Sequence, residues 1–144
     1  MKFLLILVYL SFFLGCRKDS TLSDFKSDGC SLFPDSSLIT NEDWCVCCYE
    51  HDLTYWQGGT KAERLAADEA LKRCVLSKTG NKELAEIMFL GVRLGGSPYF
   101  YTWYRWGYGW GYDRLYEPLT DKEKSQVAEK LLVLEREETV SPCR

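Results

Sequence analysis

The sequence lacks several features by which a function is often recognised. Its 144 residues include one histidine, His51, so no pair of histidines can form a metal site. There is no block of basic residues and the net charge is −3. This composition argues against nucleic acid as a partner and against strong attraction to anionic lipid. No internal repeat is present, and the length suits one small domain preceded by a targeting segment.

Long apolar runs are missing too. The run Phe3–Leu14 is shorter than the roughly 20 residues of a membrane-spanning helix. Residues 1–15 are instead typical of a signal peptide. The Gly15-Cys16 pair indicates a bacterial lipoprotein site, with Cys16 lipidated as the new N-terminus; the alternative is an ordinary signal peptide cut slightly later. We therefore expect an exported protein, a cell-envelope lipoprotein or else a periplasmic or secreted protein, with a polar tether over 16–27 and a domain over 28–144.

Cysteine is plentiful by comparison. Seven cysteines are an odd number for an exported protein, and setting Cys16 aside leaves six. Six cysteines allow three disulfides, which suit a small exported domain with a modest core. They are Cys30, Cys45, Cys47, Cys48, Cys74 and Cys143.

Turn and capping signals predict four helices. A first helix is expected from Thr40 or Asn41 to about Trp56, and the others over about 60–76, 82–94 and 120–137. Glutamates three residues after Thr60 and Thr120 form capping-box patterns, and glycines follow the first three helices. The fold class is therefore mainly α, with additional helices around a helix pair and an aromatic, glycine-rich insertion.

That insertion, Tyr99–Tyr112, reads YFYTWYRWGYGWGY. From Tyr104 onward an aromatic residue falls on every second position with glycines between, which is the period of a β-strand. Such a strip either packs on the helices, the interpretation we favour, or forms a platform at a membrane interface. Base stacking is disfavoured because Arg105 is its only cation.

The segment CCYEHDLTY, residues 47–55, has the most informative chemistry. In a helix, His51 shares a face with Cys47, Cys48 and Tyr55, and Asp52 lies about 100° further round. This arrangement indicates a general base beside a cation site.

The following helix offers partners for this face. If the two helices form an antiparallel hairpin, Asp68 is nearly level with His51, and Cys74 is nearly level with Cys45 and Cys47. Direction favours Cys47, which lies about 40° from His51, whereas Cys45 lies about 120° away. Position along the helix axes alone is compatible with a bridge from Cys74 to either Cys45 or Cys47.

Over roughly residues 28–75 the chain resembles secreted phospholipase A2. That family's signature is two cysteines, two free positions, His-Asp, two more positions and a tyrosine, and every fixed position is present here. Asp68 matches a second aspartate, six residues before Cys74. The resemblance implies a disulfide-linked antiparallel helix pair, with Cys47 joined to Cys74 and Cys30 to Cys48. Cys45 and Cys143 then remain for a third bridge.

The resemblance also implies a mechanism. His51 would hold a water, Asp68 would fix its tautomer, and Tyr55 would hydrogen-bond Asp68. Asp52 would bind Ca²⁺ together with backbone carbonyls of Gly29, Ser31 and Phe33. The family's usual glycines after the first cysteine are absent, so the loop resembles divergent members of the family. Asp28 or Asp35 could assist, and the alternative is a plain connecting loop.

We therefore expect Ca²⁺-dependent hydrolysis of an acyl ester of a glycerophospholipid, with a phospholipid surface as partner. One alternative is a non-catalytic member of the same fold that binds lipid or protein in the cell envelope. A second is a zinc site made from Cys45, Cys47, Cys48 and His51, which the awkward adjacent cysteines disfavour. A more distant alternative is a disulfide-stapled envelope or toxin-type interaction protein that uses the aromatic strip.

Overall fold

The computed structural model describes residues 21–31, 33–36, 43–136 and 143. Within these ranges the chain forms four helices: α1 (Cys45–Gln57), α2 (Lys61–Thr79), α3 (Lys82–Gly95) and α4 (Asp121–Arg136). The same ranges contain no β-strand, only an isolated bridge between Ser36 and Asp43. The prediction of a mainly helical domain is confirmed. No helix in the described part has the length and apolarity to span a bilayer.

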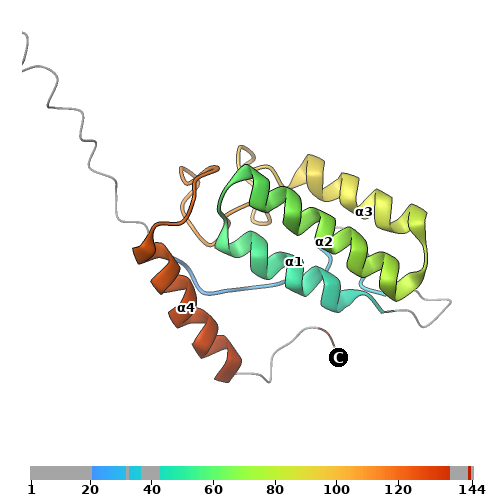
Figure 1. Ribbon diagram of the computed structural model, residues 1–144, viewed down its shortest axis with the longest axis horizontal. Coiled ribbons are helices and arrows are strands. Elements are labelled where there is room, and N and C mark those ends of the chain that lie inside the picture. Colours follow the sequence, from blue (N-terminus) through green and yellow to red (C-terminus); the bar gives the residue numbers. More distant parts are fainter. Residues whose placement is uncertain (1–20, 32, 37–42, 137–142, 144) are drawn as a thin grey trace, which may run out of the picture.

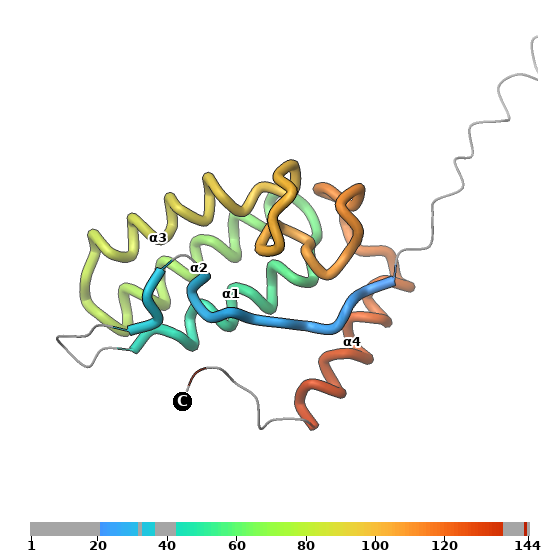
Figure 2. The backbone as a smooth tube through the Cα atoms, turned by 180° about the vertical axis from the view of Figure 1, so that it is seen from behind, coloured from blue at the N-terminus to red at the C-terminus, as the bar shows by residue number. Residues whose placement is uncertain are grey.

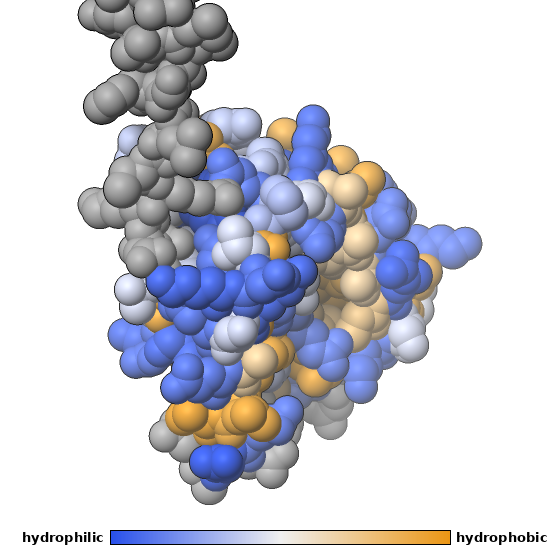
Figure 3. All heavy atoms as spheres, turned by 60° about the vertical axis from the view of Figure 1, so that its left-hand side comes forward, coloured by the Kyte–Doolittle hydropathy of each residue, from blue (hydrophilic) through white to orange (hydrophobic). Residues whose placement is uncertain are grey.

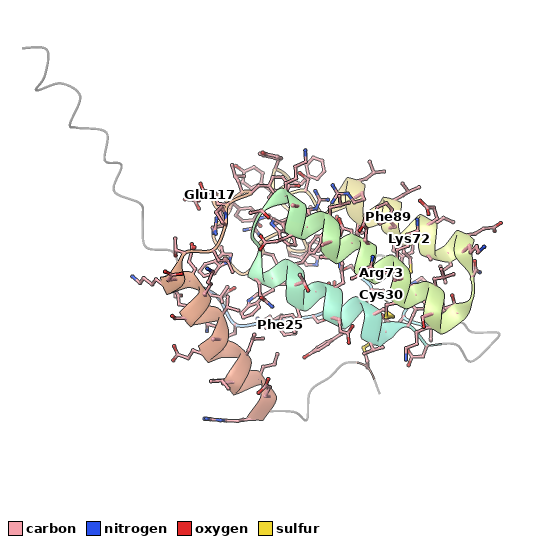
Figure 4. The ribbon with its side chains drawn as sticks, in the orientation of Figure 1. Phe25, Cys30, Lys72, Arg73, Phe89 and Glu117 are labelled. Carbon is pink, nitrogen blue, oxygen red and sulfur yellow. A yellow bond between two sulfur atoms is a disulfide. The ribbon has the colours of Figure 1, made fainter. Side chains whose placement is uncertain are left out.

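Three of the helices lie side by side. Figure 1 shows α2 between α1 and α3, and α2 contacts both of them. Lys72 on α2 lies 5.1 Å from the ring centroid of Phe89 on α3 and pairs with Glu86, a contact region that can be followed in Figure 4. Helix α4 lies to one side, where Val127 joins a core cluster with Leu22, Trp56 and Trp110.

The capping signals define the helix boundaries well. The Thr60 hydroxyl accepts a hydrogen bond from the Glu63 N–H, and the Glu63 carboxylate accepts one from the Thr60 N–H, so the capping box is present. Thr120 and Glu123 make the same reciprocal bonds before α4. Helix α2 ends at Thr79 rather than at about Leu76, because Gly80 supplies the left-handed residue that terminates it, with φ 64°.

The predicted start of the first helix is wrong. Helix α1 begins at Cys45 and not at Thr40 or Asn41, and residues 40–42 lie outside the described ranges. The Trp44 N–H donates to the Asp35 carbonyl at 3.1 Å, and the Asp43 carboxylate accepts from the Cys45 N–H at 2.8 Å. The backbone just before Cys45 is therefore hydrogen-bonded to the preceding loop and is not part of the helix.

Three disulfides tie α1 to the rest of the chain. Cys30 is joined to Cys48, Cys47 to Cys74, and Cys45 to Cys143. These are the pairs implied by the resemblance. They attach α1 to the loop before it, to α2 and to the chain beyond α4.

The expected polar tether packs against the domain over residues 21–27. Leu22 is 1% exposed, and the Trp56 indole donates to the Ser23 carbonyl at 2.9 Å. The ring of Phe25, labelled in Figure 4, lies 5.7 Å from that of Trp56. Figure 2 shows this segment running along α1 from the direction of α4. The packed part of the chain thus begins by residue 21 rather than 28, while the signal segment and Cys16 lie outside the described residues.

The strand-like period of the aromatic insertion does not correspond to a β-strand. Residues 99–112 form turns and bends, and Gly107 adopts a left-handed φ of 71°. The Gly107 and Gly109 N–H groups donate to the carbonyls of Tyr55 and Trp56, so the segment closes over the end of α1. Trp106 and Trp110 are buried, as expected for a strip that packs on the helices. Tyr99, Phe100, Tyr101 and Trp103 remain half or more exposed.

Gly109 is a point of close packing between the aromatic insertion and α1. A Cβ atom there would lie 2.5 Å from both Leu22 Cδ1 and Trp56 Cδ1, and 2.6 Å from the Trp56 carbonyl oxygen. We expect Gly109→Ala to lower the free energy of unfolding by about 1–3 kcal/mol through overpacking. Gly95→Ala is the control, because its Cβ would meet only Tyr104 at 3.7 Å. Equal denaturant midpoints for the two variants would contradict this packing.

The insertion also allows a matched pair of tryptophan substitutions. Trp106 is 1% exposed and its indole donates to the Gly59 carbonyl at 2.8 Å, whereas Trp103 is 67% exposed. We expect Trp106→Ala to cost about 3–5 kcal/mol and Trp103→Ala less than about 1 kcal/mol. Chemical denaturation followed by circular dichroism measures both; a cost at Trp103 equal to that at Trp106 would show that the insertion packs differently.

Candidate active site

A buried carboxylate brings the proposed catalytic residues together. His51 on α1 and Asp68 on α2 are 7% and 0% exposed. The His51 Nε2 lies 2.8 Å from Asp68 Oδ1, and the Tyr55 hydroxyl donates to the same oxygen at 2.7 Å. An anionic carboxylate at Nε2 favours the tautomer with its proton there, which leaves Nδ1 as the acceptor nitrogen.

Two arginines complete the shell of Asp68, and sequence reasoning missed both. Arg93 on α3 donates to Asp68 Oδ2 at 2.6 Å. Arg64 on α2 lies 3.8 Å from the same oxygen and donates to the Tyr55 hydroxyl at 3.0 Å. Arg64 stands four residues before Asp68, so the helical i, i+4 rule was a usable signal. Arg93 lies on another helix, and nothing local in the sequence indicated it.

These contacts decide the charge of each partner. Burial alone would raise the pKa of Asp68, but hydrogen bonds from His51, Tyr55 and Arg93 hold it below its ordinary value. Burial and the charge of Asp68 raise the pKa of Tyr55 far above its usual range. Asp68 is therefore an anion and Tyr55 a neutral donor, as an orienting carboxylate and its support require.

The His51 ring faces a cavity of about 330 Å³, within the usual range for small-molecule sites. Its walls are mostly apolar and come from α1, α2, α3, the loop before α1 and the aromatic insertion. The lining residues are Gly29, Cys30, Ser31, Phe33, Cys48, His51, Asp52, Tyr55, Leu71, Met88, Gly91, Val92, Gly95, Gly96 and Tyr104. At Gly96 a Cβ would lie 2.6 Å from the Tyr55 ring, so glycine allows α3 to approach the site closely.

Asp52, the next residue on α1, has an unusual carboxylate. Burial, with a smaller contribution from the charges of Asp28 and Asp35, raises the pKa of Asp52 to about 7, although the hydrogen bond from the Ser27 hydroxyl opposes the rise. That bond is 2.7 Å long. Within the described residues no lysine or arginine forms an ion pair with any of these three aspartates. A cation that binds beside these three aspartates would therefore stabilise their ionised form.

The loop next to Asp52 is held by its own side chains. Gly29 and Ser31 have left-handed φ angles of 76° and 52°. The Cys30 N–H donates to Asp35 Oδ1 at 2.7 Å, and the Ser31 hydroxyl donates to Asp28 at 2.9 Å. The structure thus brings Gly29, Ser31 and Phe33 to the cavity that His51 and Asp52 also line.

No group of three or more His, Cys, Asp or Glu side chains in the described ranges is arranged to hold a metal. A calcium site made from one carboxylate and backbone carbonyls contains no such group. The zinc alternative is contradicted, because Cys45, Cys47 and Cys48 are all consumed in disulfides.

Comparison with protein-family models, curated proteins and solved structures gives no match to this chain. The functional argument therefore rests on the geometry of the site.

The raised pKa of Asp52 predicts a pH-dependent stability. Between about pH 4 and pH 7 the unfolded chain ionises this residue while the folded protein keeps the proton, so the free energy of unfolding falls as pH rises. In the presence of a chelator, the free energy of unfolding of the wild type should fall by an amount on the order of 1–3 kcal/mol over this pH range. The Asp52→Asn variant should not show this fall.

Thermal melts from pH 4 to pH 8 measure the difference between the two proteins. The exposed Asp113→Asn is the control and should follow the wild type. Parallel pH profiles for the wild type and Asp52→Asn would refute the assignment.

Proposed function

We propose that this protein hydrolyses an acyl ester of a glycerophospholipid in a Ca²⁺-dependent reaction. The observation that carries the proposal is the buried His51–Asp68–Tyr55 group at an apolar cavity that Asp52 also lines. A base, its orienting acid and a neighbouring oxygen ligand are the parts that water-mediated ester hydrolysis needs.

His51 is the proposed general base. Its Nδ1 takes a proton from a water, and the water oxygen bonds to the ester carbonyl carbon. The imidazolium is stabilised by Asp68, which the two arginines and Tyr55 keep in place. Collapse of the tetrahedral intermediate breaks the bond between the carbonyl carbon and the alcohol oxygen. The alcohol oxygen takes the proton from the His51 imidazolium. The products are a free fatty acid and a lysophospholipid.

The donors beside His51 fit a hard cation. Asp52, with the backbone carbonyls of Gly29, Ser31 and Phe33, would hold Ca²⁺, an ion that prefers carboxylate and carbonyl oxygens. The raised pKa of Asp52 supports this assignment, since the carboxylate gains from a nearby positive charge. When bound, the ion would polarise the ester carbonyl and stabilise the oxyanion.

Exposed apolar side chains support a phospholipid surface as partner. Leu94 and Tyr101 are 75% and 85% exposed, and both adjoin segments that line the cavity. Figure 3 shows another face, toward α4, where hydrophobic residues form patches separated by hydrophilic ones. The three disulfides fit an oxidising compartment. We propose an exported protein anchored through a lipid on Cys16.

A non-catalytic lipid-binding protein is the second candidate. It is favoured by the Ser27 hydroxyl, which occupies one oxygen of Asp52, and by Phe33, whose ring packs against the core instead of leaving an open loop. In that case the same cavity holds an acyl chain without turnover.

Substitution of His51 tests the proposal. In His51→Gln, the amide can still donate to Asp68 but cannot accept a proton, so the fold should persist while hydrolysis falls by about 10²–10⁴-fold. Fatty-acid release from phospholipid vesicles in millimolar Ca²⁺ is the measurement. Glu50→Gln, an exposed change at the adjacent position on α1, is the control and should keep full activity.

Near-normal turnover in a folded His51→Gln protein would end the proposal. A wild-type protein that binds vesicles but releases no fatty acid with Ca²⁺ would favour the non-catalytic candidate.

A further inference from the structure

A second cavity, of about 790 Å³, adjoins the first. The two cavities share Asp52 and Tyr104. The second is walled by the N-terminal segment on one side and by the aromatic insertion on the other, including Trp103, Arg105 and Tyr112. The ester chemistry proposed above makes no use of it.

Arg105 is the distinctive group in this cavity. It is only 4% exposed, yet no carboxylate of the described residues forms an ion pair with it. Among the described residues its guanidinium donates one hydrogen bond, from Nη2 to the Trp110 carbonyl at 2.6 Å, and it stacks on Tyr112 with its carbon 3.9 Å from the ring centroid. Arginine has five N–H donors, and a buried arginine normally has an anionic partner. The unused donors and the uncompensated charge indicate an anionic ligand.

The same cavity also carries negative charge. Asp24 forms an ion pair with Lys130 at 2.5 Å, whereas Asp28 has no cationic partner among the described residues and accepts hydrogen bonds from Ser31 and the Trp103 indole. Lys26 lies at the exposed edge of the cavity. The cavity therefore offers Arg105 and Lys26 to an anion, and Asp28 with aromatic rings to a cation. Aromatic faces beside a carboxylate suit an ammonium group.

We propose that the second cavity is a subsite for a zwitterionic phosphoester, in which Arg105 binds the phosphate and Asp28 with its neighbouring rings binds the ammonium. The ligand is the head group of a lipid such as a phosphatidylethanolamine, and this lipid assignment rests on the proposed function. The reacting ester then lies in the first cavity and the head group in the second, with Asp52 between them. A phosphate joined to an ammonium by two carbons presents both charges within one such cavity.

Binding of soluble probes tests the subsite without any turnover. Phosphoethanolamine, glycerol 3-phosphate and ethanolamine are titrated into the folded protein by calorimetry or by NMR. The wild type should prefer phosphoethanolamine. Arg105→Gln should weaken both phosphate probes at least tenfold, whereas Arg73→Gln, a change at a 69% exposed side chain on α2, should leave them unchanged. Unchanged phosphoethanolamine binding in folded Arg105→Gln overturns the proposal.

Asp28→Asn is the deciding variant if Arg105→Gln does not fold, because Asp28 is exposed and, within the described part of the chain, its carboxylate accepts hydrogen bonds only from Ser31 and Trp103. This variant should lose the preference for phosphoethanolamine over glycerol 3-phosphate. A retained preference overturns the ammonium site and with it the proposal.

Vesicles then identify the source of the phosphoester. The His51→Gln protein should bind phosphatidylethanolamine vesicles more tightly than phosphatidylglycerol vesicles, and Asp28→Asn should abolish the difference. Soluble-probe binding without any vesicle preference supports the subsite and overturns the lipid as its source. These measurements are independent of fatty-acid release, so failure of the hydrolysis proposal is distinguishable from failure of this one.

Discussion

The structure depends most on the hydrogen bonds and ion pairs of the Asp68 carboxylate. It is fully buried and takes hydrogen bonds from His51 and Tyr55 on α1 and from Arg93 on α3, with Arg64 close by on its own helix. A buried anion that lost such partners would cost several kcal/mol. Arg64 extends the network, because it donates to the Val92 and Arg93 carbonyls in the last turn of α3. The contacts that orient the proposed base therefore also hold three helices in register.

Helix α1 connects this network to both cavities. His51 and Asp52 are consecutive, so they point about 100° apart, one toward Asp68 and the other toward the loop before α1. The disulfides of Cys45, Cys47 and Cys48 limit the movement of α1 relative to that loop, to α2 and to the chain beyond α4. The N-terminal segment and the aromatic insertion close over the far end of the helix through Gly109. A ligand that spans the two cavities would lie across Asp52.

Local signals in the sequence predicted the helices wherever a cap decides the boundary. The pairs Thr60–Glu63 and Thr120–Glu123 act within one turn, so the sequence contains all that is needed. The start of α1 was missed because Trp44 is held by the Asp35 carbonyl, a partner in another segment. The strand period of the insertion was misleading for a similar reason. Its glycines serve close approach to α1, and Gly107 turns the chain.

The sequence by itself determined the mainly helical class, the cysteines available for three bridges, and the face of α1 that carries His51, Tyr55 and Cys47. These follow from helical periodicity and short-range capping, which act between residues close in the chain. Only the tertiary structure decided that Arg93 binds Asp68, that Ser27 holds Asp52, and that Arg105 is buried without an acid partner. Each of these features joins segments 25 or more residues apart or depends on burial. A local sequence pattern predicts neither a contact between distant segments nor the burial of a side chain.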